Sequence, residues 1–305
     1  KGYHMQLLFR NSLITLVSSA EWFLSQILHK YYIKFPNRKE IQSSTLTLAD
    51  LVSLDSVEEA QKLVIADKIE GVLRGSFDEW CKYLKSQLNL SMGYLERDKG
   101  IINETFQRRN LVVHNGGIVN SHYLNHVKSD FRYKGNIDEP IHITRQYLEN
   151  RLKTFELIFT LISAELWKQL EPDDVDRDAL LFKISWNHLE AERWDVAAGL
   201  CYFGMNDGKM PELSRQIHRI NYWQSKKWMG KYSEIEQEVK EFDVSAMDKK
   251  FLLGKLALMD EDDEFERIGK IVFNSNGMDK EDFIEWPIFR KMREKGIVDK
   301  VLEDE

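Results

Sequence analysis

Cysteine, proline and glycine are scarce in this chain. Its 305 residues include only two cysteines, Cys81 and Cys201, which lie far apart in the sequence. We therefore expect no disulfide framework and no cysteine-based zinc site, and two free thiols favour the reducing environment of the cytoplasm. Five prolines and 16 glycines leave long segments without a helix breaker, so the composition predicts a folded, all-α protein.

Long apolar runs are also missing from the sequence. The most apolar segment, residues 155–167, is interrupted by Glu156, Thr160, Ser163 and Glu165, so we expect no transmembrane helix and no membrane partner. Neither a glycine-rich phosphate loop nor a Gly-x-Ser-x-Gly elbow occurs, which argues against P-loop and serine-hydrolase chemistry. The first residue is not methionine and no signal-peptide pattern follows, as expected of a chain that starts inside a longer protein.

The net charge of −7 is unevenly distributed along the chain. Residues 1–170 hold 22 Lys+Arg and 19 Asp+Glu, a balance of +3, whereas residues 171–305 hold 21 and 31, a balance of −10. Because an acidic surface repels nucleic acid, we expect the second half to bind a regulatory protein partner instead. The acidic, proline-containing segment 171–176 predicts a boundary between two domains, residues 1–172 and 173–305.

Long helices are predicted for the first domain. The helix over residues 5–33 carries Leu8, Ser12, Thr15, Ser19 and Trp22 amid many apolar residues, and we expect much of its surface to be buried. Further helices are expected over residues 56–74, 76–90, 96–114 and 144–170, with N-cap candidates at Thr47 and Asp55 and a capping box formed by Ser76 and Glu79.

Shorter helices with a weak repeat are predicted for the second domain. The aromatic residues Trp194, Tyr232 and Phe265 are 38 and then 33 residues apart, near the period of helix-turn-helix arrays. The region resembles degenerate tetratricopeptide repeats, although the full consensus is missing. The many tryptophans of this half fit a repeat core, with a peptide-binding groove as the alternative.

The segment 108–117 combines an arginine pair, an amide and a histidine just before a double glycine. On a helix, Gln107, Asn110 and His114 share one uncharged polar face, whereas Arg109 lies on a neighbouring apolar line and needs a partner or a ligand. Arginine and histidine together can neutralise a phosphate and transfer a proton near neutral pH. The structural alternative is that His114 bonds the carbonyls of the helix end while Arg109 pairs with a carboxylate such as Glu21.

The pattern Arg109-Asn110-x-x-x-His114, late in an all-helical domain, resembles the signature of the HEPN superfamily over roughly residues 1–170. The resemblance implies a metal-independent endoribonuclease without a cofactor, acting in toxin, stress or antiviral defence. It implies a homodimer in which Arg109, Asn110 and His114 of the two chains line one composite cleft. It implies that His114 transfers protons, that Arg109 neutralises phosphate charge and that Asn110 orients the histidine. Arg108 and Gln107 are expected to bind the RNA substrate. Gly116 stands where some members carry a modifiable tyrosine, which argues against that form of control here.

Two other groups consist of residue types that can bind a metal ion. His122 and His126 share a helical face, but no third ligand is evident, so surface histidines in a connecting segment are expected. The carboxylates of residues 260–264 are expected to form a solvated turn. The alternative function for the whole chain is a non-catalytic helical protein that binds a protein partner through its repeat region. An Arg109 side chain that is buried from solvent and paired with Glu21 would favour that alternative.

Overall fold

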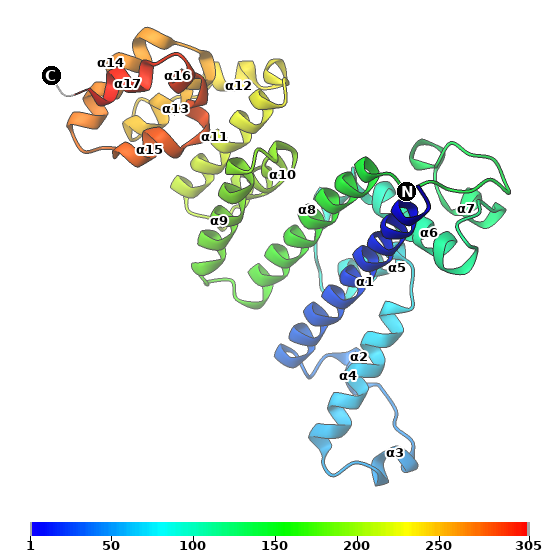
Figure 1. The fold of residues 1–305 in the computed structure, drawn as a ribbon. Coiled ribbons are helices and arrows are strands. Elements are labelled where there is room, and N and C mark those ends of the chain that lie inside the picture. Colours follow the sequence, from blue (N-terminus) through cyan, green and yellow to red (C-terminus); the bar gives the residue numbers. More distant parts are fainter. Residues whose placement is uncertain (1, 304–305) are drawn as a thin grey trace. The chain divides into compact units, whose positions relative to one another are not determined.

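The computed structural model describes residues 2–303 and shows an all-α protein (Figure 1). Within this range the β-structure amounts to one isolated bridge between Ile118 and Pro140. The chain divides into two compact units, one ending at Pro172 and the other beginning at Asp173. None of the described helices is both long enough and apolar enough to cross a membrane.

The first unit is built around two long helices, α1 and α8, both of which contact α6. Helix α1 also contacts α4 and α8 along its length (Figure 1). The elements of this unit are α1 (Gly2–Lys34), α2 (Lys39–Gln42), α3 (Leu48–Val52), α4 (Val57–Leu73), α5 (Phe77–Gln87), η1 (Gly93–Leu95), α6 (Lys99–His114), α7 (Ser121–His126), η2 (Ser129–Phe131) and α8 (Arg145–Leu170).

Side-chain caps set the starts of several helices. Ser76 and Glu79 form the predicted capping box at α5, and Thr47 caps α3 together with Asp50. The prediction of Asp55 as an N-cap is wrong by one residue. Ser56 accepts a hydrogen bond from the backbone N–H of Glu59 and caps α4 instead.

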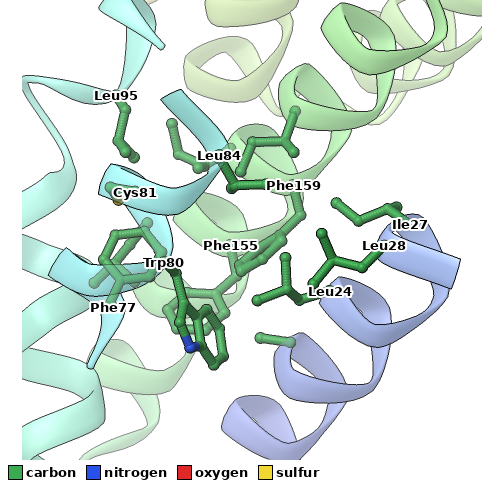
Figure 2. Packing of buried hydrophobic residues seen from close by; sticks show 14 of the residues in the cluster. Leu24, Ile27, Leu28, Phe77, Trp80, Cys81, Leu84, Leu95, Phe155 and Phe159 are labelled. Atoms are coloured by element: carbon green, nitrogen blue, oxygen red, sulfur yellow. The ribbon is translucent and has the colours of Figure 1, made fainter. Parts of the chain in front are cut away.

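The core of the first unit lies between α1, α5 and α8. Figure 2 shows Leu24 and Leu28 of α1 facing Phe155 of α8, with Trp80 of α5 beside them. The Trp80 ring lies 5.1 Å from the ring of Phe106, so the motif helix α6 packs into this same cluster. Each such fully buried side chain stabilises the fold by roughly 1.5–3 kcal/mol.

Helix α1 buries one face and exposes the other. Its buried face includes Leu13, Val17 and Leu24, as expected of a long core helix. The line that begins at Leu8 and ends at Trp22 faces solvent, with 58% and 66% of these two side chains exposed. The expectation that this helix is buried on much of its surface therefore fails along this line.

The second unit consists of shorter helices around its own core, in which Trp223, Phe265, Phe283 and Phe289 are buried. Trp194 begins α10, whereas Phe265 lies inside α14 and Tyr232 begins a 3-10 turn, so the three aromatics do not occupy equivalent positions. The elements are α9 (Asp176–Glu190), α10 (Trp194–Met205), α11 (Glu212–Trp228), η3 (Tyr232–Glu234), α12 (Glu236–Glu241), α13 (Lys249–Met259), α14 (Asp262–Asn274), α15 (Lys280–Glu285), η4 (Pro287–Phe289), α16 (Arg290–Glu294) and α17 (Ile297–Leu302).

Candidate functional site

The motif helix α6 ends where the double glycine predicts. His114 is its last residue, and the backbone N–H groups of Asn115 and Gly117 both bond the carbonyl of Leu111 at 2.9 Å. Gly116 and Gly117 have φ values of 60° and 80°, a left-handed conformation that favours glycine and turns the chain away from the helix axis. The turn places His114 at a free helix end.

A pocket of about 320 Å³ opens beside this helix end. Three of the five predicted site residues, Gln107, Asn110 and His114, lie on its α6 wall. The uncharged polar face inferred from helical spacing is therefore one side of a real pocket. The remaining lining residues are Leu111, Asn115, Asn120, His122 and Tyr123.

The side chain of His114 is exposed at this pocket. Among the described residues it makes no hydrogen bond to the carbonyls at the end of α6, which is the role that the structural alternative gave it. The imidazole is thus available to a ligand in the pocket. Amide groups surround it, and amides can donate to phosphate oxygens without adding charge.

Arg109 forms an ion pair with Glu21 of α1, as the structural alternative predicted. The two side chains are 20% and 31% exposed, so the pair is partly open to solvent and is not sealed. Arg109 does not line the pocket. Any contact between Arg109 and a phosphate therefore requires that the guanidinium exchange Glu21 for the phosphate.

Arg108 is buried, with 5% of its surface exposed. Its Nε donates to Glu104 at 2.6 Å, its Nη1 donates to the carbonyl of His142 at 3.2 Å, and the guanidinium carbon lies 3.9 Å from the ring centroid of Tyr147. These contacts occupy the side chain within the core. The structure does not present Arg108 to the pocket as a phosphate contact.

Glu104 is the centre of this buried network and is fully shielded from solvent. Besides Arg108, it accepts hydrogen bonds from Tyr123 at 2.8 Å, from Tyr147 at 2.9 Å and from Arg151 at 3.4 Å. Burial, reinforced by the adjacent Glu104 carboxylate, raises the pKa of Tyr123. The network joins α6, α7 and α8 through one carboxylate and thereby positions α7 beside the pocket.

The segment after the motif folds back over α6. Helix α7 carries His122 and His126, whose rings stack with centroids 4.0 Å apart. Both histidines are exposed, but only His122 lines the pocket. No group of three or more His, Cys, Asp or Glu side chains that could hold a metal ion occurs among residues 2–303.

Sequence reasoning missed Asn115, Asn120 and Tyr123 as lining residues and assigned His122 no role. The contact of Tyr123 with Glu104 spans 19 residues and has no sequence signal, because it depends on how the loop returns to the helix. Arg10 was also missed. Its Nη1 donates to the carbonyl of Gly116 at 3.2 Å, which places a cation from α1 at the turn next to His114.

The expectation that the carboxylates of residues 260–264 form a solvated turn is wrong in part, because Asp262, Asp263 and Glu264 form the first turn of helix α14. Asp260 pairs with Lys227 at 2.7 Å and with Lys291 at 3.1 Å, which lowers the pKa of its carboxyl group despite partial burial. Asp262 pairs with Lys295 at 2.6 Å. These lysines hold Asp260 and Asp262 in a structural ion-pair cluster.

Comparison with protein-family models, with curated proteins and with solved structures finds no match for this chain. The likeness to HEPN domains therefore rests on the residues of the motif, on the all-α fold and on the position of the motif at a helix end.

Proposed function

We propose that this chain is a metal-independent endoribonuclease of the HEPN type that acts in toxin, stress or antiviral defence. The observation that supports it is the pocket at the end of α6, where an exposed His114 lies between Asn110, Gln107 and further amide groups. A histidine among uncharged hydrogen-bond donors suits a phosphodiester, which needs proton transfer and charge stabilisation.

The proposed reaction is attack by a ribose 2′-hydroxyl on the adjacent phosphorus. His114 transfers a proton in this step, and the amides of Asn110 and Gln107 donate hydrogen bonds to the phosphate oxygens. Arg109 would neutralise the additional negative charge after leaving Glu21. We omit Arg108 from the substrate contacts because it is buried and bound to Glu104.

The assembly we propose is a two-fold homodimer. The exposed line of α1 from Leu8 to Trp22 passes Ser12, Thr15 and Ser19 and bears no charge, which suits packing against a second copy of the helix. The acidic second unit would bind a regulatory protein. A cytoplasmic location fits the two thiols, which are free and buried in separate units.

The test is cleavage of RNA in excess EDTA. The wild-type chain should produce fragments with a 2′,3′-cyclic phosphate and a 5′-hydroxyl, and DNA of the same sequence should survive because it has no 2′-hydroxyl. His114→Ala should reduce cleavage by about 10²-fold or more. Loss of wild-type cleavage in EDTA, with recovery on adding magnesium, would contradict the proposed chemistry.

A second candidate function has one specific observation in its favour. The Arg109–Glu21 ion pair gives the motif arginine a structural partner, as expected of a non-catalytic helical protein that binds a partner through its second unit. In that case Glu21→Gln would weaken the fold slightly and would create no gain in RNA binding or cleavage.

A further inference from the structure

We infer that His122 is the second proton-transfer group of the pocket and acts together with His114. The inference rests on the proposed ribonuclease function. Its basis is that two histidines from two different helices line one pocket: His114 ends α6, and His122 is the second residue of α7. Such a pair would give the pocket both an acid and a base.

The chemistry explains why two groups are needed. A base takes the proton from the 2′-hydroxyl while the bond from O2′ to phosphorus forms. An acid gives a proton to the 5′ oxygen while the bond from phosphorus to that oxygen breaks. The products are a 2′,3′-cyclic phosphate and a 5′-hydroxyl, and no further reactant is consumed. Two imidazoles can perform both transfers near neutral pH.

The fold holds His122 in place through its neighbours. The adjacent Tyr123 is almost fully buried; its hydroxyl donates to Glu104 at 2.8 Å and accepts from the backbone N–H of Tyr133 at 3.0 Å. The His126 Nδ1–H donates to the carbonyl of His122 at 2.8 Å. These contacts fix the backbone at His122 and leave its ring exposed beside the pocket.

The other groups around the pocket do not compete for this role. Tyr123 is the remaining titratable side chain in the lining, and burial raises the pKa of its hydroxyl above the usual range. The asparagine and glutamine amides do not titrate. The charged groups packed against α7 include Glu104 and Arg108, which are bonded to each other, and Arg132, whose Nε donates to the carbonyl of Val127 at the end of α7. The His126 ring stacks on His122, with the two centroids 4.0 Å apart, but it does not line the pocket. His114 and His122 are therefore the two imidazoles in the lining.

The experiment compares His114→Ala, His122→Ala and, as a matched control, His142→Ala. His142 is an exposed histidine of the same connecting segment and lies outside the pocket lining. Each protein is given ordinary RNA and an RNA whose scissile phosphate carries a bridging 5′ sulfur. A thiolate leaves without protonation, so the sulfur substrate bypasses the acid but still needs the base.

We expect both pocket variants to cleave ordinary RNA about 10²-fold more slowly than wild type, and the control to cleave it normally. The sulfur substrate should restore cleavage in one of the two variants, the one that lacks the acid. Melting temperatures should agree among all four chains, since His122 and His142 are exposed.

Three results would overturn the inference. If wild type cleaves RNA and His122→Ala cleaves it equally well, His122 has no part in the reaction while the proposed function stands. If both variants are slow and the sulfur substrate restores neither or both, the two histidines are not an acid–base pair. If wild type cleaves neither substrate, the proposed ribonuclease function is wrong, and so is the acid–base pairing of His114 and His122.

Discussion

Replacement of Glu21 by glutamine distinguishes a catalytic Arg109 from a structural one. The substitution keeps the size of the side chain and an acceptor oxygen but removes the charge that now holds Arg109. A partly exposed ion pair of this kind stabilises a protein by at most about 1 kcal/mol. If Arg109 must leave Glu21 to reach a phosphate, that energy opposes RNA binding in the wild-type chain.

The expected gain in kcat/KM for RNA follows from the energy of the ion pair between Arg109 and Glu21. Since 1.4 kcal/mol corresponds to a tenfold change, removing about 1 kcal/mol of competition should raise kcat/KM for RNA about fivefold. Cleavage of a short fluorescent RNA at low salt, with the substrate concentration well below KM, measures this ratio. Arg109→Ala should lose activity by about 10²-fold, because the charge stabilisation of the transition state disappears.

The matched control is Glu70→Gln. Glu70 pairs with Arg74 at 2.7 Å on the exposed surface of α4, so the control adds the same unit of charge without freeing Arg109. An equal gain in both variants would mean that RNA responds only to net charge. No gain in Glu21→Gln, in a chain that remains folded, would refute the role of Arg109 as a phosphate contact and would favour the interaction protein.

Three further predictions concern assembly, pH and control. Light scattering should show a dimer for wild type and a monomer for Trp22→Glu, and full activity of that monomer would remove a site shared between protomers. Burial lowers the pKa of His218 from 6.5 to about 4 and leaves both its ring nitrogens without partners, so the ring is neutral when folded. Because the unfolded chain binds that proton below pH 6.5, urea titrations should show stability falling by up to about 3 kcal/mol between pH 6.5 and 4, and falling less in His218→Leu. Deleting residues 176–305 should leave a folded domain with unchanged or higher cleavage, and a folded truncation that cannot cut RNA would show that the acidic unit belongs to the substrate site.

Local sequence signals predicted the helices of the first unit well. The capping box of Ser76 with Glu79 and the N-cap Thr47 are both present, and α8 begins within one residue of its expected start. The end of α6 at His114 follows from the two glycines, which adopt the left-handed conformation. These features depend on residues within one or two turns of each other, so the sequence alone can reveal them.

Features that depend on distant contacts were predicted less well. The exposure of Leu8 and Trp22 cannot be read from α1 alone, because periodicity shows that a face is apolar but not which neighbours cover it. The pairing of Arg109 with Glu21 could be anticipated, since a cation on an apolar line needs a partner. The role of Tyr123 could not be anticipated, because nothing in the sequence distinguishes its partner Glu104 from an ordinary carboxylate on a helix.

The buried network also bears on the choice between the two candidate functions. Glu104 carries one negative charge and contacts two arginines, Arg108 and Arg151, so this cluster holds a net charge of +1. Tyr123 joins the cluster to the pocket, since its hydroxyl bonds Glu104 and the residue is part of the pocket lining. A buried positive charge is weakly screened, so it favours an anionic ligand there. Arg108 can thus assist phosphate binding through its field while remaining out of contact with it. This charge and the amide lining support the proposal of a phosphate-carrying ligand over that of a protein-binding scaffold, which would use neither.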